Sequence, residues 1–397
     1  MSPTGIAIGR QQKMFRVVFC LCLPLFLQLV NVRSEMLTPP CDQRHHTPVA
    51  ALGSGSCPRR AIDQTAVAPN APKDRIKKLT KSYRDKRLCC GKRRGRLPSV
   101  CNQKSWPGAK ETLGLLPLGG VLGFFGDSIM WQASRAFAID AAASGFKIIE
   151  MRQYSGPLNL SNPEDGQGAN GVEGLEQGSW RRESIKFQKQ EHEWILDYYA
   201  ISALGGKGRL MSDLVRHALD RSDLVTLNAG LHYHANPKGR ATVDTLRVDL
   251  LAAAKELAEF NVRSDVLRAR RAAVFVETTP QHFASRDRSG DFDRRSGGDK
   301  KKNKSSFRCP SSVLKQALAN NWRNDVMHEV AKVTKNVPVV PVFEDLVGSN
   351  AFHNDGDLDC THWCMEPKIW APRIGRMYLV FKDILDGRNL TTAQHLS

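Results

Sequence analysis

The chain has 397 residues, of which 41% are hydrophobic and 25% charged, so much of it can form the core of one large domain or two ordinary ones. The net charge of +18 is concentrated in two segments. Residues 73–110 contain fourteen Lys/Arg against two Asp/Glu, and residues 286–308 contain nine Lys/Arg against four Asp. The rest of the chain is nearly neutral, which argues against a nucleic-acid-binding surface built into the fold.

The N-terminus has the pattern of a secretory targeting segment. Arg10, Lys13 and Arg16 precede an apolar run at residues 17–30, "VVFCLCLPLFLQLV". This run is shorter than the ~20 residues that span a bilayer comfortably, so a cleaved signal peptide and an uncleaved type II anchor within residues 1–33 are both open. The basic flank comes first, which places the body in the lumen. We therefore expect a type II Golgi membrane protein or, alternatively, a secreted one.

Cysteine usage agrees with an oxidising compartment. Two cysteines lie inside the apolar run, and eight lie after it, an even number as in a disulfide-bonded secretory protein. The disulfide candidates are Cys41, Cys57, Cys89, Cys90, Cys101, Cys309, Cys360 and Cys364. Acceptor sequons for N-glycosylation begin at Asn159, Asn303 and Asn389.

Composition divides the rest of the chain. Residues 34–118 are rich in Pro, Gly, Ser and basic side chains and are expected to form a disordered basic stem. Such a stem is either a solvated tether or a surface attracted to anionic glycans or phospholipid headgroups. Residues 119–386 are expected to form the folded domain, with a polar surface-loop insertion at 284–308 and a C-terminal tail at 387–397.

Within 119–386, apolar strand-like runs alternate with amphipathic helical patterns. Strands are expected near residues 121–126, 146–152, 194–202, 223–230, 272–280 and 337–343. Helices are expected near 129–145, 210–222, 242–261, 314–335 and 374–385. This alternation predicts an α/β fold with a mostly parallel, doubly wound sheet. Ligands of such sheets bind at the carboxyl ends of the strands, which here carry "GDS", "NAGLHYH" and "TTPQHF".

The stretch "GFFGDSIMWQ" places a serine between a strand and a helix. Gly126 ends the strand, and Ser128 stands at the N-terminus of the helix. Backbone N–H groups and the helix dipole stabilise negative charge there, as an attacking alkoxide or an oxyanion requires. A serine in this position is also an ordinary helix cap.

The stretch "DLDCTHWC" at residues 357–364 supplies possible partners. The spacing of Asp359 and His362 lets the carboxylate bind Nδ1 of the imidazole and hold Nε2 toward a nucleophile on another strand end. Alternatively, Asp359 caps a turn and His362 is a surface residue. Zinc binding by Cys360, His362 and Cys364 is a third reading, less suited to an oxidising lumen than disulfides.

Four motifs together resemble a known family. "GDS" and Asp-x-x-His resemble the SGNH (GDSL-type) hydrolase superfamily. "DCTHWC", "LNAGLHYH" and "TTPQHF" resemble its PC-esterase branch, which includes the plant trichome-birefringence-like polysaccharide O-acetyltransferases. The resemblance covers roughly residues 119–386. It implies an SGNH-hydrolase-like three-layer sandwich with a mostly parallel central sheet.

The resemblance also implies roles for individual residues. Ser128 would be the nucleophile, His362 the general base and then acid, and Asp359 the carboxylate that orients it. The backbone of Ser128 would form the oxyanion hole with Asn228 and Gly230. The chain departs from the family at Trp131, where many members have Arg, and in the basic insertion that replaces a shorter Trp-containing stretch.

Three more positions complete the expected site, namely Gly126, Asp127 and His282. The first two belong to the turn that carries the serine. His282 could line the acceptor site, or it could lie behind the site or at the surface without contacting the acceptor.

The expected function is glycan or polysaccharide O-acetyl transfer through an acyl-Ser128 intermediate. A carbohydrate acetyl esterase would use the same triad, and a non-catalytic glycan-binding protein would carry a relict triad. We expect no metal and no bound cofactor, but an acyl donor such as acetyl-CoA or another acetyl carrier as co-substrate. The expected partners are a glycan acceptor and, if the anchor is uncleaved, a membrane. No nucleic acid is expected.

Overall fold

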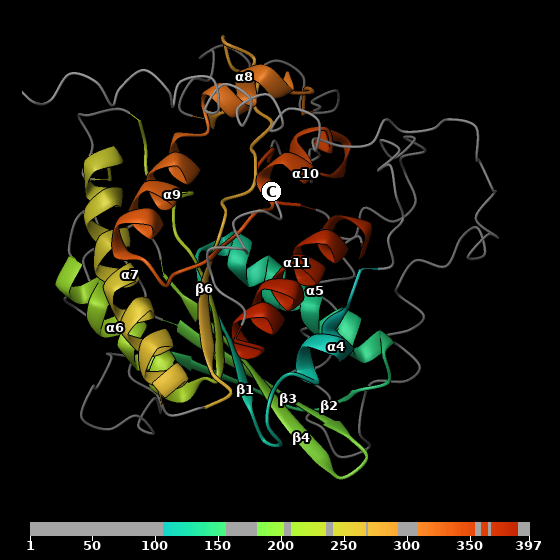
Figure 1. The fold of residues 1–397 in the computed structure, drawn as a ribbon. Helices are drawn as coiled ribbons and strands as arrows, with labels where there is room; N and C mark the ends of the chain where they lie inside the picture. Colours follow the sequence, from blue (N-terminus) through green and yellow to red (C-terminus); the bar gives the residue numbers. More distant parts are fainter. Residues whose placement is uncertain are drawn as a thin grey trace, which may run out of the picture. The chain divides into compact units, whose positions relative to one another are not determined.

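The fold is built on a seven-stranded mixed sheet with strand order β2-β3-β4-β1-β5-β6-β7 (Figure 1). The strands are β1 (Val121–Gly126), β2 (Lys147–Ser155), β3 (Arg181–Lys189), β4 (His192–Ala200), β5 (Leu224–Asn228), β6 (Ala272–Val276) and β7 (Val339–Val340). Strands β4, β1, β5, β6 and β7 pair in parallel, whereas β3 runs antiparallel to both β2 and β4. The expectation of an α/β fold with a mostly parallel sheet is confirmed.

The computed structural model describes residues 106–155, 181–201, 208–235, 241–266, 269–292, 309–353, 359–363 and 367–387. All of them lie in one compact unit of the chain, Gly55–Ser397.

Helices cover both faces of this sheet. They are α4 (Ala109–Leu113), α5 (Ser128–Ala143), α6 (Gly208–Arg221), α7 (Val243–Val266), α8 (Leu314–Ala319), α9 (Trp322–Thr334), α10 (Phe343–Val347) and α11 (Pro367–Leu385), with a 3₁₀ turn η4 (Asn350–Phe352). One apolar cluster joins the sheet to α4, α5 and α11, and a second joins its other face to α6, α7 and α9 (Figure 1).

The central strands are apolar on both sides because both faces are covered. In β1, Phe124 packs into the first cluster and its neighbour Phe125 into the second, as the period of two along a strand requires. All five residues of β5 and all five of β6 are buried. This burial explains their continuous apolar sequences.

Strand β3 was not expected from the sequence, because "RRESIKFQK" is mostly charged or polar. Its buried apolar residues are Ile185 and Phe187, two positions apart, and Lys186 between them faces the other side. A tight turn with Gln190 at φ 58° returns the chain into β4. This antiparallel hairpin adds a part to the sheet that a purely parallel, doubly wound arrangement does not contain.

Local sequence interrupts two of the predicted elements. The helix predicted at 314–335 is divided into α8 and α9 at Asn320 and Asn321. Asn320 donates its side-chain amide to Gln316 O at 2.8 Å, and such local bonds compete with helix continuation. The strand predicted at 337–343 pairs only over β7, because Pro338 and Pro341 flank it and lack the N–H that a ladder needs.

The folded domain begins before residue 119. Ala109 and Leu113 of α4 are fully buried in the first apolar cluster, and Ala109 N donates to Asp140 Oδ2 of α5 at 2.6 Å. The C-terminal part of the predicted stem is therefore part of the core. Its apolar sequence "ETLGLLPL" is a short, isolated run, too weak a periodic signal to be recognised as a helix.

The predicted surface loop is also partly incorrect. Residues 284–292 are described, and Ser289 and Asp291 in this stretch are buried. Asp291 Oδ1 pairs with Arg323 Nη1 at 3.3 Å, and Trp322 Nε1 donates to Oδ2 at 3.2 Å. The buried Arg323 guanidinium thus stabilises this polar segment within the fold. Arg323 is distant in sequence, so the local sequence of the segment does not indicate its burial. Residues 293–308 lie outside the described residues.

Several other predictions fall outside the described part of the chain. These concern the targeting segment, residues 34–105 of the stem, the three sequons and the cysteines Cys41, Cys57, Cys89, Cys90, Cys101 and Cys364. Across the described ranges, none of the helices combines the length and apolarity needed to cross a membrane.

Candidate functional site: a hydrogen-bonded serine, histidine and aspartate

The turn between β1 and α5 has space for glycine alone at its first position. Gly126 has φ 154°, and an added Cβ would lie 2.2 Å from Asn228 O of the neighbouring strand. Asp127 then caps α5, with Oδ1 accepting from Ile129 N at 2.9 Å, and its Oδ2 accepts from Leu231 N at 3.3 Å. One carboxylate therefore fixes both the helix N-terminus and the loop after β5.

Ser128 is the first residue of α5 and meets His362 from the far end of the chain. Ser128 Oγ lies 2.6 Å from His362 Nε2, and His362 Nδ1 lies 2.5 Å from Asp359 Oδ2. An N–H on Nδ1 donates to the carboxylate, which leaves Nε2 to accept the serine hydroxyl proton. The side chains of His362 and Asp359 are 23% and 28% exposed, so the group is open to a ligand.

Asp359 is held as a carboxylate. Burial would raise its pKa, but the hydrogen bond and charge of the His362 ring lower it, as do the backbone N–H groups of His362 and Thr361, which donate to Oδ1. The net result is a pKa of about 2. The carboxylate is thus ready to stabilise a cationic imidazole.

Two backbone N–H groups near Ser128 are available for an oxyanion. Within the described residues, the N–H groups of Ser128 and Gly230 donate no hydrogen bond. Gly230 lies in the loop that Asp127 binds through Leu231, and an added Cβ there would lie 2.6 Å from Thr278 Oγ1. These groups have the free donors that an oxyanion hole requires.

Asn228, the other expected oxyanion donor, has its amide directed elsewhere. The side chain is fully buried, and Nδ2 donates to Val276 O at 2.7 Å and to Thr278 Oγ1 at 3.1 Å. These bonds tie the end of β5 to the end of β6. In this structure Asn228 supports the strand ends, and both of its amide protons are already used.

His282 does not line an open site. Its side chain is fully buried; Nε2 donates to Val347 O at 2.6 Å, and Nδ1 lies 2.6 Å from His353 Nε2. His353 in turn donates from Nδ1 to the main-chain carbonyl of His362 at 3.0 Å and stacks on Trp363 at 3.9 Å between ring centroids. Of the two alternatives for His282, the structure supports the one without acceptor contact, because the buried ring supports the His362 loop through His353.

The contact between the His282 and His353 rings has no proton to share when both rings are neutral. The contacts to Val347 O and His362 O each require an N–H, which uses the only proton of each neutral ring and leaves two acceptors facing each other. A third proton would make the pair cationic. Burial opposes that charge, lowering the pKa of His282 to about 4 and that of His353 well below its ordinary value.

A disulfide anchors the loop beside Asp359. Cys309 and Cys360 are bonded, 51 residues apart in sequence, and both are buried. Both cysteines were among the disulfide candidates, and the structure gives their pairing, which the sequence left open. The zinc reading needs Cys360 as a thiolate and is inconsistent with this bond. In the part of the chain that the structure describes, no group of three or more His, Cys, Asp or Glu could hold a metal ion.

Three side chains that hold the histidine loop were not expected from the sequence. Gln132 on α5 exchanges two hydrogen bonds with the main chain of Trp363. Thr279 Oγ1 accepts from Trp363 Nε1 at 3.1 Å, and His353 binds His362 O. Gln132 had a sequence signal, because it is four residues after Ser128 and so shares its helix face. Thr279 lies in the strand-end segment "TTPQHF", and His353 had no such signal.

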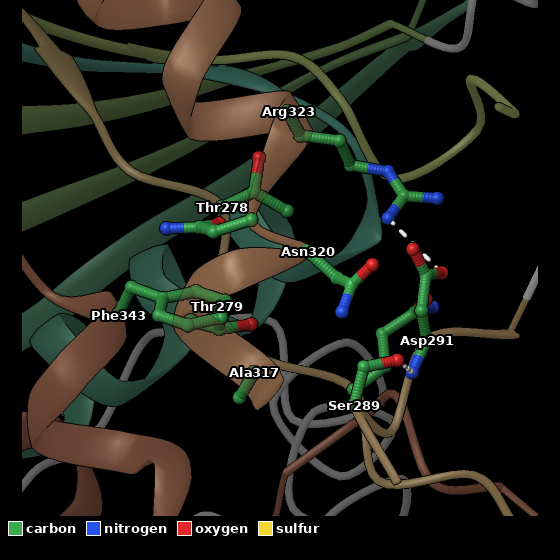
Figure 2. Close-up of a pocket in the computed structure, with 10 residues that line it drawn as sticks. Thr278, Thr279, Ser289, Asp291, Ala317, Asn320, Arg323 and Phe343 are labelled. Carbon is green, nitrogen blue, oxygen red and sulfur yellow. Dashed lines mark hydrogen bonds and ion pairs between the residues drawn. The ribbon is translucent and has the colours of Figure 1, made fainter. Parts of the chain in front are cut away.

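A small polar pocket lies behind the same loop. It is lined partly by Thr279 and Gln281, which bind Trp363 and Thr361, and Figure 2 shows the Arg323–Asp291 ion pair on its other side. Ser128, Asp359 and His362 are not among the lining residues. Most of the polar groups in it are already hydrogen-bonded within the protein, so the pocket is a supporting polar layer.

The topology explains why these residues meet. After β1 the chain builds β2, β3 and β4 on one side of it, and then crosses to β5 on the other. The carboxyl end of β1 therefore lies at the point where the winding direction reverses, where open α/β sheets place their ligand sites. Ser128 lies two residues after the end of β1, and Gly230 lies two residues after the end of β5.

No family model, no curated protein and no solved structure matches this chain at the significance required.

Proposed function

We propose that the described domain is an acyltransferase that works through an acyl-Ser128 intermediate. The observation that carries this proposal is the continuous hydrogen-bonded chain from Asp359 through His362 to Ser128 Oγ, with distances of 2.5 and 2.6 Å. Nucleophilic acyl transfer needs a hydrogen-bonded carboxylate, an imidazole that it orients, and a hydroxyl group placed at a helix N-terminus.

In the first half-reaction, Ser128 Oγ attacks the carbonyl carbon of the acyl donor while its proton passes to His362 Nε2. The oxyanion that forms is stabilised by the N–H groups of Ser128 and Gly230. The tetrahedral intermediate then collapses, the bond from carbon to the leaving group breaks, and His362 returns the proton to that group. Asp359 stabilises the imidazolium between the two transfers.

In the second half-reaction, a hydroxyl of the acceptor gives its proton to His362 and attacks the acyl-serine. The ester bond to Ser128 breaks, and the proton returns to Ser128 Oγ. A sugar hydroxyl as acceptor yields a glycan O-acetyl ester, and water would yield free acid.

We choose a glycan hydroxyl as acceptor and acetyl as the acyl group because of the four motifs. The resemblance to the PC-esterase branch of SGNH hydrolases covers the Ser128 turn, the loop after β5, the end of β6 and the "DCTHWC" loop. We propose on the same basis that the helices and sheet form an SGNH-like three-layer sandwich. The N-terminal apolar run and the Cys309–Cys360 bond support a lumenal enzyme, anchored in the Golgi membrane and preceded by a basic stem.

The test uses the chain from residue 34 onward, expressed as an oxidised protein, with a chromogenic acetyl ester as donor. Intact-mass spectrometry should find one acetyl adduct, absent in Ser128→Ala. Candidate oligosaccharides should then discharge the adduct faster than buffer alone and gain one acetyl group themselves. Discharge by water alone would identify a carbohydrate esterase instead. An unchanged cellular phenotype of Ser128→Ala would overturn the enzymatic proposal in favour of a glycan-binding role.

A further inference from the structure

Gln132 is a buried polar side chain that the proposed chemistry does not use. It is fully buried on α5, and its neighbours on the same face, including Ile129 and Ala136, belong to the first apolar cluster. A buried amide is costly unless its donors and acceptor are bonded. Its bonds therefore indicate its role.

Those bonds all go to one residue, Trp363. Gln132 Nε2 donates to Trp363 O at 2.8 Å, and Trp363 N donates to Gln132 Oε1 at 3.0 Å. The planar amide thus pairs with the N–H and C=O of a single residue, as two strands do in an antiparallel ladder. Two bonds in one plane fix both the distance and the orientation of the Trp363 main chain.

This clamp closes a ring that contains the proposed nucleophile and base. Ser128 and Gln132 are one helical turn apart on the same face of α5. Trp363 is joined by a peptide bond to His362, whose Nε2 returns to Ser128 Oγ at 2.6 Å. Apart from the hydrogen bond between Ser128 and His362, the remaining links of this ring are covalent or a helix turn. The amide clamp therefore contributes directly to where the imidazole lies relative to Ser128.

We propose that Gln132 is a positioning residue for the serine–histidine pair, because its two hydrogen bonds to Trp363 hold the His362 ring in place relative to Ser128. The inference rests on the proposed acyl-transfer function. Gln132 touches neither the donor nor the acceptor; it acts through the main chain of Trp363. Because a displacement of about 1 Å costs on the order of 100-fold in rate, the clamp contributes to catalysis through geometry.

Two variants separate this role from simple packing. Gln132→Met keeps the length and removes both bonds. Gln132→Glu is nearly isosteric and restores both bonds only while its carboxyl is protonated, when the O–H donates to Trp363 O and the other oxygen accepts from Trp363 N. Once ionised, the carboxylate is a buried charge facing a carbonyl oxygen.

The structure offers a matched control in Asn261. Its side-chain amide also exchanges two bonds with the main chain of one residue, accepting from Ala273 N at 2.8 Å and donating to Ala273 O at 2.9 Å, and it donates a third bond to Asn336 O at 2.7 Å. It is buried on α7 and binds near the start of β6, at the opposite end of the strand from the Ser128 edge. Asn261→Asp therefore also replaces a buried amide by a carboxyl group, but it leaves the Gln132–Trp363 hydrogen bonds unchanged.

The experiment follows the rate of acetyl-Ser128 formation from pH 5.5 to 8.5, with the thermal midpoint measured for every protein. Gln132→Met is expected to be slowed about 100-fold at all pH values. The rate of Gln132→Glu relative to wild type should fall as the pH rises through the pKa of its buried carboxyl. Asn261→Asp should lose thermal stability but acylate within about twofold of wild type.

A second readout does not depend on turnover. The proton in the His362 Nδ1–H···Asp359 bond gives a far-downfield NMR resonance, visible without substrate. Wild type and Asn261→Asp should show it, and Gln132→Met should lose it. Rates within twofold of wild type and a retained resonance in both Gln132 variants would overturn the inference. A wild-type protein with the resonance but no adduct would refute the acyl-transfer function alone.

Discussion

At the scale of single residues, the site depends on carboxylates and rings whose ionisation is fixed by neighbours. Asp359 binds the His362 ring with Oδ2, while Oδ1 receives two backbone N–H groups from its own loop. The carboxylate therefore shapes the loop and orients the imidazole together. Its removal should affect the chemistry more than the fold.

We predict that Asp359→Asn lowers the rate of acetyl-Ser128 formation by about 10⁴-fold, because an amide allows the wrong histidine tautomer. The pKa of about 2 in the folded chain is below the ordinary value of 3.8. The carboxylate thus stabilises the fold by about 2 kcal/mol above pH 4 and loses that contribution as the pH falls toward 2. Urea unfolding of both proteins from pH 2 to 7 measures the difference. Equal acylation rates would contradict the role of Asp359.

The buried His282 and His353 rings predict a separate pH dependence. The pKa of His282 is about 4 in the folded chain, from an ordinary value of 6.5, because burial disfavours the charged ring. The unfolded chain therefore binds more protons between these values, and stability falls as the pH drops from 6.5 to 4. For His282 alone the loss is about 3 kcal/mol.

The measurement is the free energy of unfolding in urea at pH 7, 5.5 and 4. His282→Gln should flatten the decline between pH 6.5 and 4, whereas His192→Gln, at an exposed position, should leave it unchanged. An identical decline in the His282 variant would show that another group causes it.

At the scale of elements, the loop at 359–363 is held from three directions. Gln132 binds it from α5, Thr279 from the end of β6, and the disulfide connects it to Cys309 ahead of α8. These contacts replace regular secondary structure, which the loop lacks. A segment without its own ladder needs such ties to keep a side chain in place.

We predict that replacing Cys309 and Cys360 together by Ser lowers stability by about 4 kcal/mol, the chain-entropy value for a closed loop of this length. Acylation should slow as well, because Asp359 is adjacent to Cys360. Urea unfolding and adduct formation under oxidising conditions test both effects, and reducing agent should have the same effect on wild type. Wild-type acylation by the double variant would show that the bond serves stability alone.

Parts of this scale were predictable from the sequence, and the reasons differ by element. β1, β5 and β6 are buried on both faces, so their apolar runs indicate strands directly. β3 lies between β2 and β4 and runs antiparallel to both, and its mostly charged sequence gives no apolar run that would indicate a strand. The hydrophobic pattern alone predicts a longer strand at β7 and one continuous helix over α8 and α9. Two prolines limit the strand, and two asparagines divide the helix.

The candidate site divides in the same way. Ser128, Asp359 and His362 could be proposed because strand ends and short spacings suggest chemistry locally. Asn228 and His282 were assigned to the site by motif, but their contacts are with distant segments, Val276 and Val347, that no local pattern reveals. Gln132 was overlooked because a glutamine on an apolar helix face gives no sign of the main chain it binds.

At the scale of the whole molecule, the domain includes α4, which the sequence assigned to the stem. Ala109 and Leu113 are fully buried, and α4 packs against both α5 and α11. The first turn of the folded domain therefore supports the helix that begins with Ser128. A boundary placed at residue 119 cuts through the core.

We predict that a chain beginning at residue 119 is less stable than one beginning at residue 106 by at least about 5 kcal/mol, because buried leucines lose their place in the core. This corresponds to a thermal midpoint lower by about 10 °C or more. Circular dichroism melts of the two proteins test it, with a Leu113→Ala variant of the longer chain as an intermediate case. Equal midpoints would return α4 to the stem.

Ser128 and His362 are 234 residues apart in the chain. A ribosome adds about 5–20 residues per second, so the serine is synthesised roughly 10–50 s before the histidine. Until then β1 and α5 present a hydroxyl without a base, and afterwards the base still has to reach its place. Under the proposed acyl-transfer mechanism, Ser128 therefore cannot be acylated until His362 has been synthesised and its loop has folded against α5.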